Sequence, residues 1–115
     1  MKLDRIAMIA IVAVLGLWSS GASAQDVTGV WAANDGATYY IRQIGPEVWW
    51  FGDGSPRFSN VAHGHYEGDS IRLQWVDVPK GGTSSQGELT LHAENGRLVA
   101  RRATGGFSAR VWTRQ

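Results

Sequence analysis

GATYYIRQIGPEVWWF, the stretch Gly36–Phe51, places two short apolar runs on either side of an Ile-Gly-Pro-Glu corner. Both runs are rich in Tyr, Trp, Ile and Val, which favour β-strands, whereas Gly-Pro favours a turn. The stretch therefore predicts a β-hairpin with strands at 37–44 and 47–52, in which Ile41 faces Trp50. It also carries five aromatic side chains, and strand alternation sends some of them inward and others outward.

The same pattern continues along the chain, because short runs of β-forming residues are separated by Gly, Asn and Asp and no window shows helical apolar spacing. We expect eight strands, at 28–33, 37–44, 47–52, 58–67, 70–78, 86–94, 97–103 and 108–114. Two-residue turns alternate with longer connections, so an up-and-down arrangement gathers all tight turns at one end. The sequence predicts an all-β, eight-stranded antiparallel up-and-down β-barrel with one closed end and one loop-framed mouth.

The tight turns also set the register of the paired strands. Asn95-Gly96 is the strongest hairpin signal, since a type I′ turn needs positive φ at both positions. A two-residue turn there makes Leu89 face Arg102, with both side chains pointing inward. The preceding tight turn in the same way makes Ala62 face Trp75, so that a small side chain opposes a large one.

The beginning of the chain has the pattern of a secretory signal peptide. A basic start precedes the apolar run Ile6–Trp18, and small residues follow up to Ala24. The apolar run is shorter than the roughly 20 residues that a membrane-spanning helix needs. We therefore expect residues 1–24 to be a cleaved signal peptide. Residues 25–115 are then one exported barrel domain, periplasmic or extracellular, with no membrane span.

Charge and composition exclude several classes of function. Of the 11 basic and 10 acidic side chains, Lys2, Arg5 and Asp4 lie in the expected signal peptide, which leaves nine of each sign. This balance argues against binding to nucleic acid or to an anionic membrane surface. The chain contains no cysteine, which excludes a disulfide, a thiol nucleophile and attachment of lipid to a cysteine.

Three residues in the first and last expected strands carry a family resemblance. Gly29-Val30-Trp31 begins the first expected strand and Arg114 ends the last. Gly-x-Trp with an Arg from the final strand covering the Trp resembles the calycin superfamily of lipocalins, avidins and fatty-acid-binding proteins. The resemblance implies a barrel that binds small apolar ligands in its mouth, with Gly29, Trp31 and Arg114 at the closed end.

A longer resemblance covers GVWAANDGATYYIRQIGPEVWWFG at Gly29–Gly52 and WVDVPKG at Trp75–Gly81. These stretches are similar to small secreted bacterial proteins of unassigned function, which implies the fold and export but no activity. The chain is shorter than a typical lipocalin and has no cysteines for its disulfide, so a roomy cavity does not follow from the resemblance.

Inward side chains near the mouth form the candidate ligand site. Strand direction places Tyr39, Trp50, Asp77 and Arg102 there, with Trp75 one layer below. Buried charges are costly unless they are paired. Asp77 and Arg102 therefore form an ion pair that plugs the mouth, or remain solvated at the rim, or anchor a small apolar or aromatic ligand between aromatic walls.

The outer face offers a second candidate surface, made of Tyr40, Arg42, Trp49 and Phe51. Neighbouring exposed aromatic side chains are typical of interfaces. The alternatives are that a loop or terminus covers them, or that a one-residue register error exchanges the two faces. If the patch is exposed, a solid barrel could serve as an interaction, self-assembly or inhibitor module for a protein partner or a second copy.

The sequence gives little support to metal binding or catalysis. His63-Gly64-His65 places two imidazoles on one strand face, which is half of a metal site, but His92 is expected on a strand that is not adjacent. We therefore expect solvated histidines and no bound metal. A glycosidase needs two carboxylates, and Asp77 is a lone inward acid. There is also no G-x-S-x-G motif, so we predict a non-enzymatic protein without catalytic residues or cofactors.

Overall fold

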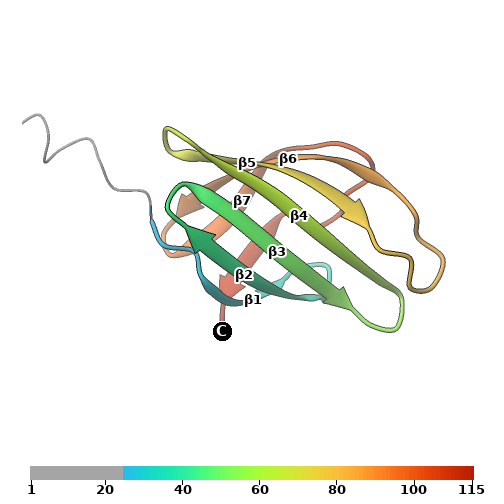
Figure 1. The fold of residues 1–115 in the computed structure, drawn as a ribbon. Helices are drawn as coiled ribbons and strands as arrows, with labels where there is room; N and C mark the ends of the chain where they lie inside the picture. Colours follow the sequence, from blue (N-terminus) through green and yellow to red (C-terminus); the bar gives the residue numbers. More distant parts are fainter. Residues whose placement is uncertain (1–24) are drawn as a thin grey trace, which may run out of the picture.

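The computed structural model describes residues 25–115, and the expected signal peptide at 1–24 lies outside the described residues. Each strand pairs with the next one along the chain, and the first pairs with the last, so the sheet closes into a barrel (Figure 1). The strands are β1 (Gly29–Ala33), β2 (Thr38–Ile44), β3 (Glu47–Gly54), β4 (Phe58–Glu67), β5 (Ser70–Asp77), β6 (Gln86–Glu94), β7 (Arg97–Ala103) and β8 (Val111–Arg114). The predicted eight-stranded antiparallel barrel is confirmed. Within residues 25–115, no helix has the length and apolar character that a membrane crossing requires.

Two-residue turns join β2 to β3, β4 to β5 and β6 to β7, so all three lie at one end of the barrel. At Asn95-Gly96 the φ angles are 54° and 77°, as a type I′ turn requires. The predicted pairs of Ile41 with Trp50 and of Ala62 with Trp75 are confirmed. Tight turns of defined length thus fixed the register that the hydrophobic pattern needed.

The four longer connections lie at the opposite end, where the strand ends differ from the prediction. Strand β3 continues to Gly54, and β8 begins only at Val111. The segment before β8 folds back toward the interior instead, and Phe107 is buried. Nη1 of Arg110 holds this segment by donating to the carbonyl oxygens of Phe107 and Ala109, at 2.6 and 3.0 Å.

Large and small side chains alternate across the inner face of the sheet. One row across β3 to β6 reads Trp50, Ala62, Trp75 and Gly87, each paired with the next. Each indole thereby occupies the space that its small neighbour leaves. A Cβ at Gly87 would overlap the backbone carbonyl of Thr104, so this glycine is needed for the close approach of the β7–β8 loop.

Aromatic rings fill the barrel below the mouth. The ring centroid of Trp50 lies 4.9 Å from that of Tyr39 and 5.6 Å from that of Trp112. Phe107 closes this cluster from the mouth side, with its centroid 4.9 Å from that of Trp75. All five side chains are buried. The lower barrel is therefore a packed core whose stability comes mainly from buried apolar surface.

At the closed end, Arg114 covers Trp31. Its guanidinium carbon lies 4.4 Å from the centroid of the Trp31 ring, a cation–π geometry. Its Nη1 and Nη2 atoms donate to the carbonyl oxygens of Thr28 and Asp26, at 2.8 and 2.9 Å. Gly29 leaves space for this cover, because a Cβ there would lie 2.8 Å from Nη1 of Arg114. The first and last strands are thus joined by side chains as well as by backbone pairing.

Candidate functional site

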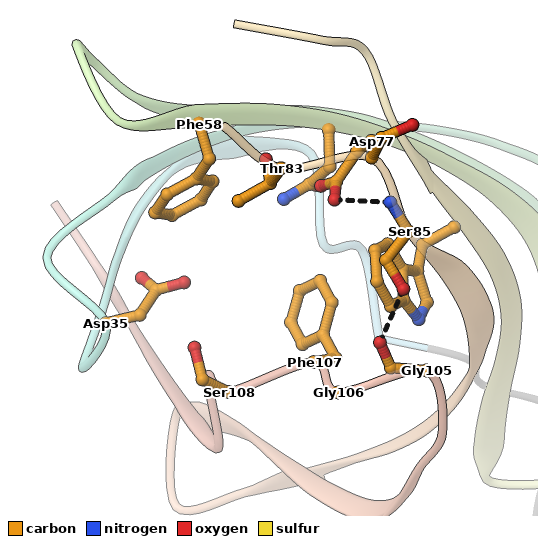
Figure 2. Close-up of a pocket in the computed structure, with 12 residues that line it drawn as sticks. Asp35, Phe58, Asp77, Thr83, Ser85, Gly105, Gly106, Phe107 and Ser108 are labelled. Atoms are coloured by element: carbon orange, nitrogen blue, oxygen red, sulfur yellow. Dashed lines mark hydrogen bonds between the residues drawn. The ribbon is translucent and has the colours of Figure 1, made fainter. Parts of the chain in front are cut away.

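The loops at the open end enclose a pocket of about 300 Å³. Its lining combines three aromatic rings, two carboxylates, one buried amide and several hydroxyl groups. The lining residues are Asp35, Phe58, Asn60, Trp75, Asp77, Thr83, Ser84, Ser85, Gly105, Gly106, Phe107 and Ser108. Figure 2 shows Asp35 and Asp77 on different sides of this ring of residues, with the Phe107 ring bordering the space that separates them. The pocket thus lies above the aromatic core and does not extend through the barrel.

Asp35 is held in the β1–β2 turn by two hydrogen bonds. Its Oδ1 accepts from the backbone N–H of Ala37 at 2.9 Å, in an Asx turn, and its Oδ2 accepts from the Tyr39 hydroxyl at 2.8 Å. Burial raises the pKa of Tyr39, and the nearby Asp35 carboxylate adds to the rise. Tyr39 therefore remains a neutral donor that fixes the orientation of the Asp35 carboxylate.

Asp77 is held at the end of β5, across the mouth from the β1–β2 turn. Its Oδ2 accepts from the backbone N–H of Ser85 at 2.8 Å, and the Ser85 hydroxyl donates to the carbonyl oxygen of Gly105 at 2.7 Å (Figure 2). The β5–β6 and β7–β8 loops are thereby tied together. In the part of the chain that the structure describes, neither Asp77 nor Asp35 forms an ion pair.

Two glycines on β3 make room for neighbouring aromatic side chains near the mouth. A Cβ at Gly52 would lie 2.5 Å from Cε2 of Tyr39 and 2.8 Å from Oδ1 of Asn60, and a Cβ at Gly54 would overlap the ring of Phe58. The same Asn60 oxygen accepts from the indole N–H of Trp50 at 2.8 Å. Because Asn60 is buried, this bond compensates the desolvation of both groups.

The structure separates the five residues of the expected ligand site. Trp75 and Asp77 line the pocket, whereas Tyr39 and Trp50 are buried beneath it, at 0% and 4% exposure.

The expected pairing of Arg102 with Leu89 is wrong. The register shifts between Thr90 and Leu91, Arg102 pairs with Thr90, and its side chain is exposed on the outer face. An ion pair between Asp77 and Arg102 is therefore also wrong.

The cause of that error is one extra residue in β7. Leu91 pairs with Ala100 as expected, but the next pair joins Thr90 to Arg102, which leaves Arg101 without a partner in β6. A bulge of this kind exchanges the faces of all residues beyond it. The sequence around Ala100 contains no glycine or proline that would mark it.

Several pocket residues were not expected from the sequence. The inward position of Asn60 could have been predicted, because the register of the β4–β5 hairpin places it opposite Asp77. Asp35 had a weaker signal, since Asn-Asp-Gly is a typical turn and Asp accepts backbone hydrogen bonds there. For Phe107, the sequence shows only a single aromatic residue in an expected loop. Its inward position depends on contacts with residues that are distant in the sequence.

The outer face carries a continuous apolar row. Paired residues from β1 to β5 form it, and each is 37–49% exposed. The row consists of Val30, Tyr40, Phe51, Val61 and Val76. Tyr40 and Phe51 stack with centroids 6.3 Å apart. In the neighbouring row Arg42 pairs with Trp49, and Trp49 stacks on His63 at 5.0 Å. The expected patch Tyr40, Arg42, Trp49 and Phe51 is thus part of a larger surface.

All three histidines contact polar neighbours on this outer face, and two of these neighbours are acidic. His63 Nε2 lies 2.8 Å from Glu47 Oε1, and His65 Nε2 lies 3.0 Å from Glu67 Oε2. His92 Nε2 lies 2.9 Å from Ser70 Oγ. No group of three or more His, Cys, Asp or Glu side chains within residues 25–115 has the geometry to hold a metal ion.

Comparison with known proteins does not assign the chain to a family. No family model, no curated protein and no solved structure matches it.

Proposed function

We propose that this protein is an exported, non-enzymatic, calycin-like barrel that binds a small ligand with an apolar or aromatic body at its open end. The observation that carries the proposal is the pocket of about 300 Å³, which is floored by aromatic rings and edged by oriented polar groups. Concave, mostly apolar sites with a few fixed polar groups are typical of small-molecule binding. The export signal expected at 1–24 and the Trp31–Arg114 contact at the closed end support the calycin-like assignment.

Filling the pocket tests this function. Ser108 lines the pocket and is exposed, so Ser108→Trp places an indole in the site without entering the core. We expect the neutral aromatic probe N-phenyl-1-naphthylamine to bind the wild-type protein and to bind the variant at least about tenfold more weakly, a change of about 1.4 kcal/mol. Fluorescence titration measures both affinities.

Thr113→Trp is the matched control, because Thr113 is an exposed residue of β8 near the closed end. It should leave probe binding unchanged. Equal binding by the wild type and Ser108→Trp would place the probe elsewhere and would contradict the proposed site. Native mass spectrometry of residues 25–115, purified without denaturant, would detect a retained ligand as mass that is lost on unfolding.

A second candidate function is self-association through the outer surface of β3, β4 and β5. The observation that favours it is charge complementarity combined with the apolar row. Glu47, His65 and Arg72 form one row across these strands, and Phe51, Val61 and Val76 form another. A two-fold axis along β4 would bring Glu47 of one copy over Arg72 of the second, and Phe51 over Val76. Isologous interfaces have this self-complementarity.

A charge exchange tests the self-association. Glu47→Arg and Arg72→Glu should each weaken a dimer by at least about tenfold, because each places like charges in contact across the interface. The double variant restores opposite charges and should restore dimerisation. Sedimentation equilibrium measures the dissociation constants. A wild-type monomer at all accessible concentrations, or a double variant no better than the single ones, would refute this arrangement.

A further inference from the structure

The charged groups of the mouth pocket have a single sign. Asp35 and Asp77 contribute carboxylates to the lining, and no lysine or arginine lines the pocket. An aspartate is negatively charged near neutral pH. Backbone N–H groups fix the orientation of both carboxylates, since each accepts one hydrogen bond from the main chain. The pocket therefore presents two oriented carboxylates, neither of which forms an ion pair among the described residues.

The basic side chains near the open end do not line the pocket. Lys80 pairs with Asp53 at 2.9 Å, and the Arg110 guanidinium donates to two backbone carbonyls. Arg57 is a further cation near this end, because its Nη2 would lie 3.7 Å from a Cβ at Gly36, the residue after Asp35. It forms no ion pair within residues 25–115.

The rest of the lining suits the same type of ligand. Phe58, Trp75 and Phe107 present aromatic rings to the pocket, and the Phe107 ring borders the space that separates the two carboxylates (Figure 2). The face of an aromatic ring attracts cations through its quadrupole, most strongly where water is excluded. Carboxylates beside aromatic faces therefore favour a positive charge that is attached to an apolar body.

We infer that the pocket takes an organic cation, an amine whose ammonium group lies between the Asp35 and Asp77 carboxylates and whose apolar body rests on Phe107 and Trp75. The inference rests on the proposed binding function and deepens it by naming the chemical class of the ligand. An anionic ligand such as a fatty acid carboxylate would meet two like charges in the site and would be disfavoured.

A matched set of three ligands tests the charge preference. The probes are 2-phenylethylamine, 2-phenylethanol and 3-phenylpropanoate, which share a phenyl ring and differ in charge. Isothermal titration calorimetry at neutral pH and low salt should give the amine at least about tenfold tighter binding than the alcohol, and the carboxylate the weakest binding. Low salt is needed because ions screen exposed charges.

Variants then locate the ammonium group. Asp77→Asn keeps an acceptor for the Ser85 N–H but removes the charge, and should reduce the preference for amine over alcohol by about fivefold or more. Arg57→Gln removes a cation near the Asp35 turn and should shift amine binding in the opposite direction, toward higher affinity. Asp69→Asn, in a turn at the closed end, is the control and should change neither ratio.

The outcomes separate this inference from the proposed function. If the alcohol binds as tightly as the amine while N-phenyl-1-naphthylamine still binds the pocket, the cation inference is overturned and ligand binding stands. If the amine preference is unchanged in both Asp77→Asn and Asp35→Asn, the ammonium group lies elsewhere and the inference is overturned. If neither the three phenyl ligands nor N-phenyl-1-naphthylamine bind, the proposed function fails together with the cation inference.

Discussion

Trp50→Ala should destabilise the protein by about 4 kcal/mol, whereas Trp49→Ala should cost less than about 1 kcal/mol. The two tryptophans are neighbours in β3 but lie on opposite faces, at 4% and 39% exposure. Removing the Trp50 indole leaves a cavity among Tyr39, Trp112 and Phe107. Removing Trp49 loses only an exposed stack on His63. Urea denaturation followed by circular dichroism measures both changes.

Trp50→Phe separates the polar and apolar contributions of the side chain. Phenylalanine keeps most of the ring volume but cannot donate to Oδ1 of Asn60, which is 2% exposed. An unpaired buried acceptor costs about 1–3 kcal/mol, so this variant should lie between wild type and Trp50→Ala. Equal losses for Trp49→Ala and Trp50→Ala would contradict the inward position of Trp50 and the outward position of Trp49 in β3.

The agreement between sequence and structure on these faces has a simple cause. In β3 the side-chain period is two and the turn to β2 has two residues, so one local feature fixes which tryptophan points inward. The same reasoning gave the pairs Ala62–Trp75 and Ile41–Trp50. It failed at Arg102, because the bulge at Arg101 carries no residue that requires it.

The pocket was less predictable than the barrel because its walls are loops. Trp75 and Asp77 could be placed by strand alternation, and both line the pocket. Phe107 belongs to a loop whose path is set by contacts with segments that are distant in the sequence. For example, Asn34 Oδ1 accepts hydrogen bonds from the backbone N–H groups of Arg110 and Val111. Such long-range contacts leave no periodic pattern in the sequence, so the floor of the site is visible only in the folded chain.

Gly64→Ala should destabilise the protein by about 3 kcal/mol, even though the substitution adds only one methyl group. A Cβ at Gly64 would overlap the carbonyl oxygen of Arg72 and would lie 2.8 Å from Cα of Leu73. Both are backbone atoms of β5, so the clash can be relieved only by separating β4 from β5. Glycine in a strand often marks a position where two backbones approach closely.

Gly82→Ala is the matched control for that prediction. Gly82 lies in the long β5–β6 connection, where a Cβ would meet no heavy atom within 4 Å, and its φ is not positive. We expect a change within about 0.5 kcal/mol, or a small stabilisation because alanine restricts the unfolded chain. Thermal unfolding of the two variants under identical conditions compares them directly. Equal stability of Gly64→Ala and Gly82→Ala would contradict the close approach of β4 to β5, and with it the register that places Asn60 and Asp77 side by side at the mouth.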